Sequence, residues 1–243
     1  MSNLIATWPA PPNIGALTTY NTTGFSQPPF ASNNLAYHVG DNEQHVQANR
    51  RALSLSLGLP NEPAWLEQTH TNQCVIIEED TNRVADAAIT RQKTSALAIM
   101  TADCLPILLC DQQGTEIAAI HAGWRGLANG IIENTLAKMK SPPATLLAWI
   151  GPAICQSCYE TGEDVKHTFI TRYPFTNSTF LNKNSHLYAN LPKMAELILQ
   201  SCGVTAVYQS AVCTFESKQL YSYRREAQTG RIATLIWFKQ EKL

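Results

Sequence analysis

The stretch TSALAIMTADCLPILLCDQQGTEIAAIHAGWRG, residues 94–126, holds three apolar runs separated by two short turns. This pattern predicts a strand, an irregular turn over 102–106, a strand, a hairpin over 112–115 and a further strand. Two strands joined by a hairpin bring their far ends together, so Cys104 and His121 should be neighbours in space. A thiol beside an imidazole is typical of a metal site or of a nucleophile with its base.

The segments around this stretch supply both strands and helices. Because strands arrive as hairpins and also across helices, the pattern indicates an α+β fold with mixed sheets, in one domain over residues 1–243. Asp41 with Gln44 resembles a capping box, and Asn190 is a plausible cap of a later helix. Further strands are predicted over 14–20, within 64–78, over 145–151 and 204–209, and as a hairpin over 219–238; helices are predicted over 41–57, 127–140, 162–173 and 192–203.

Composition excludes several classes of partner. The chain has 243 residues, 15% of them charged, with a formal net charge of -1. Without a basic field or a long apolar run, we expect no nucleic-acid partner and no membrane partner. The N-terminal residues lack the basic and apolar regions of a signal peptide, and the seven scattered cysteines suit reduced thiols, so we expect a cytoplasmic protein.

Two further features are ambiguous on their own. Arg50 shares an apolar helix face with Val46 and Leu53, so it either extends to the surface or pairs with an anion. His70 stands at the edge of an apolar segment and could complete a His-Cys-His set, although no local motif links it to Cys104. A buried cysteine beside a hydrogen-bonded histidine would explain the same pattern without any reaction.

Six motifs together resemble the YfiH family, long labelled multicopper polyphenol oxidase and also peptidoglycan editing factor. NLAYHVGDN (34–42) followed by NRR (49–51) fits as well. The resemblance covers essentially the whole chain. The motifs are WLEQTH (65–70), ADA (85–87), MTADCLPILL (100–109), HAGWRGL (121–127), WIGPAI (149–154) and SYRREAQTGR (222–231).

The resemblance implies a zinc site made by His70, Cys104 and His121. It implies phosphorolysis of adenosine, inosine, guanosine and 5'-methylthioadenosine, with adenosine deamination at the same site, and a layered α/β/β/α single-domain fold. The expected partners are therefore a nucleoside and phosphate. Three protein ligands leave zinc a fourth position, which is the pattern of catalytic zinc.

Residues near these motifs are candidates for the remaining roles. Asp103, beside the cysteine, could transfer protons. Phosphate needs cations, and the candidates are Arg50, Arg125 and Arg225. His38 could donate to substrate or phosphate, and Gln68 would face the same side of a strand as His70 and support the site.

The N-terminal loop departs from the family pattern. Many members carry an Arg-x-Gly-Gly loop, whereas this chain has Asn21 in place of the arginine and Thr23 at the first glycine. This difference predicts an altered affinity for substrate.

Other readings of the same residues stay open. His70, Cys104 and His121 also match a blue-copper set with Met100 as axial ligand, but a laccase needs many histidines and the chain has six, with no His-x-His pair. Cys104 could instead be the nucleophile of a cysteine hydrolase that edits cell-wall precursors. A zinc site that is only structural is a third reading. The CxxC pair at 155–158 could take part in redox chemistry or bind a metal, but it lacks a second such pair, follows a Gly-Pro turn, and Cys158 is outside the resemblance to the family.

Overall fold

The central strands are apolar on both faces because each lies in a sheet that is covered on both sides. In β7 (Leu105–Asp111), Leu108 and Cys110 belong to one apolar cluster, whereas Ile107 and Leu109 belong to another. Successive side chains of a strand point to opposite faces, so one cluster lies between the two sheets and the other lies under the helices.

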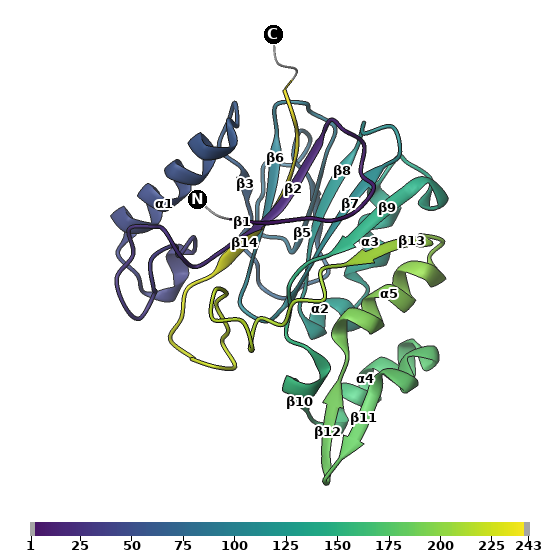
Figure 1. The fold of residues 1–243 in the computed structure, drawn as a ribbon. Helices are drawn as coiled ribbons and strands as arrows, with labels where there is room; N and C mark the ends of the chain where they lie inside the picture. Colours follow the sequence, from purple (N-terminus) through teal and green to yellow (C-terminus); the bar gives the residue numbers. More distant parts are fainter. Residues whose placement is uncertain (1–2, 241–243) are drawn as a thin grey trace.

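The computed structural model describes residues 3–240 and contains two large mixed sheets and a small one (Figure 1). The first large sheet has the order β1 (Asn3–Ile5), β2 (Ile14–Thr19), β14 (Ile232–Phe238), β6 (Ala96–Thr101), β3 (Ala64–Trp65). The second has the order β13 (Ala206–Gln209), β9 (Leu146–Ile150), β7, β8 (Ile117–Ala122), β5 (Ala87–Thr90), β4 (Cys74–Ile76). The small sheet has the order β10 (Glu160–Thr161), β12 (His186–Ala189), β11 (Phe180–Lys183).

Helices cover the outer face of each large sheet (Figure 1). Leu53 of α1 packs with Leu17 and Leu235 on the first sheet, and apolar residues of α2, α3 and α5 pack on the second. The helix α4 adds Val165 and Phe169 to the same cluster and packs beside α2. The α+β class and the α/β/β/α layers are therefore confirmed. The helices are α1 (Glu43–Leu57), α2 (Trp124–Ala128), α3 (Ile131–Lys138), α4 (Glu163–Arg172) and α5 (Leu191–Ser201), with 3-10 turns at Tyr37–Val39, Pro143–Thr145, Gln156–Cys158 and Pro174–Thr179. Within residues 3–240 no helix is long and apolar enough to cross a bilayer.

The quoted stretch forms its three predicted strands, but they belong to two sheets. β6 lies in the first sheet, whereas β7 and β8 form the central hairpin of the second. The turn over 102–104 therefore carries the chain from one sheet to the other. This crossover places Cys104 at the edge shared by both sheets.

Three local predictions differ from the structure. The helix predicted over 127–140 is broken at Gly130, whose φ is 89°, so α2 and α3 are separate. The cap of α1 is Asn42, whose side chain accepts from the Gln44 amide, and not Asp41. The hairpin predicted over 219–238 forms only its second strand, because residues 219–231 fold into turns against the site. The predicted single domain also included residues 1–2 and 241–243, which lie outside the described residues.

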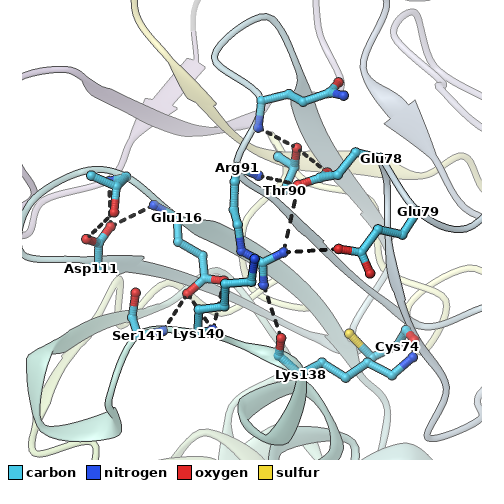
Figure 2. A network of polar contacts seen from close by, with 12 residues as sticks. Cys74, Glu78, Glu79, Thr90, Arg91, Asp111, Glu116, Lys138, Lys140 and Ser141 are labelled. Atoms are coloured by element: carbon cyan, nitrogen blue, oxygen red, sulfur yellow. Dashed lines mark hydrogen bonds and ion pairs between the residues drawn. The ribbon is translucent and has the colours of Figure 1, made fainter.

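An ionic network joins segments at the end of the second sheet where β7 ends and β8 begins (Figure 2). Cys104 lies at the opposite end, directly before β7. The Arg91 guanidinium lies 2.6 Å from the carboxylate of Glu116, just before β8, and donates to the Lys138 carbonyl at the end of α3. The Glu116 carboxylate also accepts from the amides of Lys140 and Ser141. These contacts join the β7–β8 hairpin, the end of β5 and the end of α3.

Candidate active site

His70, Cys104 and His121 converge at the edge between the two sheets. His121 lies near the end of β8, Cys104 directly precedes β7, and the register pairs Pro106 with His121, so the predicted Cys104–His121 proximity is confirmed. The three ligand atoms all lie within 4.8 Å of one another. His70 follows β3 along the chain and completes the set.

The donor set fits one tetrahedral zinc ion. The Cys104 Sγ lies 3.7 Å from His70 Nε2. Zinc bonds of ordinary length to a thiolate and an imidazole, at a tetrahedral angle, place the two donors about 3.6 Å apart. The three residues present are therefore those that would hold the metal.

Asp86 orients two of these ligands, a role that the sequence did not reveal. Its Oδ1 lies 2.7 Å from His121 Nδ1 and accepts from the His70 amide at 3.1 Å. Its Oδ2 accepts from the amide and the hydroxyl of Thr71. A carboxylate on Nδ1 leaves Nε2 as the free ring nitrogen of His121, which is a common arrangement for metal-binding histidines.

Two site residues have left-handed backbone. His70 has a φ of 61°, and a hydrogen bond from its backbone amide to the Asp86 carboxylate stabilises this conformation. Asp103 has a φ of 92°. The Asp103 carboxylate accepts from the Thr214 hydroxyl at 2.6 Å and from the Arg224 amide at 2.7 Å. Asp103 therefore braces the turn that carries Cys104 while it lines the cavity.

The glycines of HAGWRG make room for the ligands. A Cβ on Gly123 would lie 2.7 Å from His70 Cδ2 and 3.2 Å from Cys104 Sγ. A Cβ on Gly126 would lie 2.7 Å from the Thr71 carbonyl oxygen. Both positions need glycine because neighbouring atoms approach too closely for a side chain.

Charges in the metal-free site favour a thiolate beside an imidazolium. Burial raises the pKa of Cys104, but His121 and His70 offset it and bring the pKa to about 6. Burial lowers the pKa of His121, whereas the Cys104 thiolate and Asp86 raise it to about 9. Burial raises the pKa of Asp86, yet its bonds to His121 and Thr71 lower it to about 2.

A cavity of about 310 Å³ opens over the three ligands. Gln68 lines it, and its side-chain amide makes two hydrogen bonds of 2.8 Å with the backbone of Met100. Residues 68–70 are not strand, so the predicted shared strand face with His70 does not form, and the supporting role of Gln68 stays a prediction. His38 also lines it. Tyrosine rings and arginines complete the wall, and the lining residues are His38, Gln68, His70, Met100, Thr101, Ala102, Asp103, Cys104, His121, Ile154, Tyr159, Tyr223, Arg224 and Arg231.

The three arginines predicted to bind phosphate lie outside this lining. The Arg50 guanidinium is held between the rings of Tyr37 and Trp65, with Nε on the Leu35 carbonyl. Its Nη2 also lies 3.7 Å from the sulfur of Met100, a residue that lines the cavity. The cationic group thus packs behind the wall.

Arg125 and Arg225 are also engaged elsewhere. Arg125 is exposed and stacks over Trp124, with 4.4 Å between guanidinium carbon and ring centre. The Arg225 guanidinium donates to four backbone carbonyls, those of Thr214, Phe215, Ser217 and Leu220. These contacts fold the turn over 214–226.

The cations that do line the cavity are Arg224 and Arg231. The guanidinium of Arg224 donates to the carbonyls of Cys158 and Glu160, and that of Arg231 to those of Thr229 and Gly230. The motif SYRR contained the signal for Arg224, but only the turn decides which of its two arginines faces the cavity. Asp86 belongs to the motif ADA, but no local pattern connects it with His121, which lies 35 residues further along the chain.

The N-terminal loop lies against residues 218–219 and outside the cavity lining. Asn21 donates its side-chain amide to the Lys218 carbonyl, and its backbone amide to that of Gln219. Thr23 has a φ of 65°, a conformation that glycine adopts without strain. The family's glycine at this place is therefore consistent with the backbone seen here.

Comparisons with known proteins agree with this site. Residues 15–239 match the family described as multi-copper polyphenol oxidoreductase laccase. The chain belongs to this family. Among curated members, the purine nucleoside phosphorylase YfiH of Escherichia coli strain K12 is 38% identical over 241 residues, covering 98% of this chain and 99% of the relative. A purine nucleoside phosphorylase of Pseudomonas aeruginosa is 41% identical over 237 residues, covering 96% of each.

Two solved structures have the same fold as this chain. The Neisseria meningitidis protein NMB0706 superposes with a TM-score of 0.94 at 43% identity, covering 99% of this chain and all of that one. YfiH of Bacillus licheniformis superposes with a TM-score of 0.85 at 29% identity, covering 93% of each. The resemblance to the YfiH family is thereby confirmed.

Proposed function

We propose that this protein is a purine nucleoside phosphorylase that uses zinc held by His70, Cys104 and His121. The observation that carries the proposal is the convergence of these donors at the base of a cavity that also holds Arg224 and Arg231. Curated relatives that align over nearly the whole chain have the same activity in their names. Adenosine, inosine, guanosine and 5'-methylthioadenosine are the proposed substrates.

The cavity wall offers partners for each part of such a substrate. The rings of Tyr159 and Tyr223 provide flat surfaces for a purine. Arg224, Arg231 and His38 provide donors for phosphate, a role that Arg224 takes in place of the predicted Arg225. Arg50 supports the wall from behind through Met100.

The proposed reaction joins phosphate to the ribose and releases the base. A phosphate oxygen forms a bond to C1' while the bond from C1' to N9 breaks, and the purine leaves with a proton. The products of adenosine are adenine and ribose 1-phosphate. A bound zinc ion would act as a Lewis acid toward an oxygen atom of the substrate or of water. Asp103 fixes the Cys104 turn, and the arginines hold the phosphate charge during transfer.

The deciding test is purified protein with adenosine, with and without phosphate. Adenine and ribose 1-phosphate should appear only with phosphate, and Cys104→Ala should abolish both. Inosine and ammonia formed without phosphate would support the associated deaminase activity that we propose for the same site. Absence of any phosphate-dependent product at high enzyme concentration contradicts the main proposal.

A cysteine hydrolase is the second candidate, favoured by the lowered pKa of Cys104 beside His121. In that case Cys104 would attack a peptide or amide bond of a cell-wall precursor. Iodoacetamide separates the two, because a metal-bound Cys104 should resist alkylation until a chelator is added. A free nucleophile should react at once.

A copper oxidase is favoured only by the description of the family. The donor set could hold one copper ion, whereas a laccase also needs a cluster with many histidines. The candidate metal-binding groups among residues 3–240 include just one that contains histidine. Phenol oxidation that persists after free copper is removed would revive this candidate.

A further inference from the structure

A second cluster of metal-ligating side chains lies outside the cavity lining. Cys155, Cys158, Cys213 and Glu216 offer ligand atoms that all lie within 4.8 Å of one another. Glu216 Oε1 is 3.7 Å from Cys158 Sγ and 4.0 Å from Cys155 Sγ. All three cysteines are free thiols.

Two backbone segments build this cluster. Cys155 directly precedes the 3-10 turn Gln156–Cys158, which brings the two CxxC thiols to one side. A parallel β-bridge between Ala153 and Cys213 then places the segment that carries Cys213 beside the segment that leads to Cys155. The Cys155 amide points at Cys213 Sγ, 3.3 Å away, which would stabilise negative charge on that sulfur.

A turn after Cys213 supplies the fourth ligand. The Ser217 amide donates to the Cys213 carbonyl at 3.0 Å, and this turn directs Glu216 back toward the CxxC pair. The second pair thus has the spacing Cys213-x-x-Glu216, which a search for a second CxxC does not detect.

We propose that Cys155, Cys158, Cys213 and Glu216 bind a second zinc ion as a closed, four-ligand structural site. Ordinary zinc bond lengths at tetrahedral angles imply sulfur–oxygen separations of about 3.5 Å and sulfur–sulfur separations of about 3.8 Å. The observed sulfur–oxygen distances of 3.7 and 4.0 Å exceed the expected value by about half an ångström or less, and all four donors lie within 4.8 Å of one another. Three thiolates select zinc over magnesium or calcium. Each thiol releases its proton to solvent as the metal binds.

The proposed site would stiffen one wall of the cavity. The Cys158 carbonyl accepts from the Arg224 guanidinium, and Tyr159 follows directly in the lining. Thr214, next to Cys213, donates to Asp103. Zinc bound here would therefore position Arg224 and Tyr159 without touching substrate.

Cobalt(II) substitution under reducing conditions distinguishes the two sites. The intensity of the thiolate-to-cobalt absorption grows with the number of thiolates, three at the proposed site against one at the cavity. The wild type should bind two equivalents of metal. Cys104→Ser should retain one equivalent and most of the thiolate absorption, whereas Cys158→Ser should lose most of that absorption. Cys202→Ser, outside both clusters, is the control.

Glu216→Gln keeps the test decisive if Cys158→Ser fails to fold, because Glu216 is exposed. We expect it to weaken zinc binding in the Cys104→Ser background by about tenfold or more. A chelator should also lower the melting temperature of Cys104→Ser and leave Glu216→Gln in that background less affected. Absence of metal in fully reduced Cys104→Ser overturns the proposal. A Cys155–Cys158 disulfide that persists in protein purified under reducing conditions overturns it too.

Discussion

His121 Nδ1 lies 2.7 Å from Asp86 Oδ1, and both side chains are buried. The same carboxylate also accepts from the amides of His70 and Thr71. One aspartate therefore fixes the ring of one proposed ligand and the backbone of another. Asp86 therefore positions two of the proposed metal donors although it is not one of them.

Asp86→Asn should weaken zinc binding about 10- to 100-fold, because an amide cannot accept from all of these donors at once. Competition with a coloured chelator measures the change. Asp111→Asn is the matched control, since Asp111 also accepts backbone amides, those of Thr115 and Glu116, but at the far end of β7. Equal zinc affinity in Asp86→Asn and wild type would contradict the orienting role.

In metal-free protein, Cys104 should react with iodoacetamide at a pH well below the one at which an ordinary cysteine thiol becomes reactive. Its pKa is lowered to about 6, so the thiolate forms as the pH rises through 6 rather than through the ordinary value near 9. The alkylation rate, followed by mass spectrometry, should have its midpoint near pH 6. His121→Gln removes the neighbouring charge and should move the midpoint upward. An unchanged midpoint in His121→Gln would mean that another group stabilises the thiolate.

Much of this site could be predicted from the sequence, and the limits have physical causes. Strand pairing alone brought Cys104 and His121 together, because a hairpin fixes its register. His70 needed the family motifs, since its left-handed backbone and its bond to Asp86 cannot be seen in a local pattern. The Cys155–Cys213 contact spans 58 residues and depends on a parallel bridge.

The arginine assignment failed for a different reason. Arg224 and Arg225 are adjacent and identical, so only the turn at 222–226 determines which one faces the cavity. In the predicted hairpin, Arg224 and Arg225 would point to opposite faces of a strand, but the pattern does not show which of these faces lies toward the cavity. Bonds from the Arg224 amide to Asp103 and from the Arg225 guanidinium to backbone carbonyls settle the orientation.

The two arginines should therefore separate in mutational tests. Arg224→Gln should raise the KM for phosphate because its side chain lines the cavity, and it should destabilise the fold less than Arg225→Gln because its two bonds to the Cys158 and Glu160 carbonyls are exposed. Arg225→Gln should lower the free energy of unfolding by about 1–3 kcal/mol, since it loses charged bonds to backbone carbonyls. Steady-state kinetics and urea unfolding measure the two effects. A larger KM change in Arg225→Gln than in Arg224→Gln would reverse the assignment.

Gly123→Ala should abolish zinc binding at the cavity site while the fold persists. The added Cβ would lie 2.7 Å from His70 Cδ2, so the ligand must move away from Cys104. Gly162→Ala is the control, because its new Cβ would meet only the flexible carboxylate end of Asp164. Metal analysis and far-UV circular dichroism check both variants. Gly123→Ala should therefore keep only the equivalent bound at the Cys155–Cys213 cluster, and a second equivalent retained in this variant would show that the cavity ligands tolerate a shift.

Glu116→Gln should destabilise the protein without changing turnover. The Glu116 carboxylate is buried, pairs with Arg91 at 2.6 Å and accepts the amides of Lys140 and Ser141. The neutral amide weakens the closest ion pair of Arg91, which keeps Glu78 at 3.9 Å and Glu79 at 3.8 Å, so we expect a loss of about 1–3 kcal/mol in the free energy of unfolding. Glu79→Gln is the control, because Glu79 is more exposed and lies 3.8 Å from Arg91. The network lies at the opposite end of β8 from His121. We therefore expect the kcat of Glu116→Gln, measured well below its melting temperature, to match that of the wild type. A lower kcat would mean that a change at this end of the sheet reaches the site.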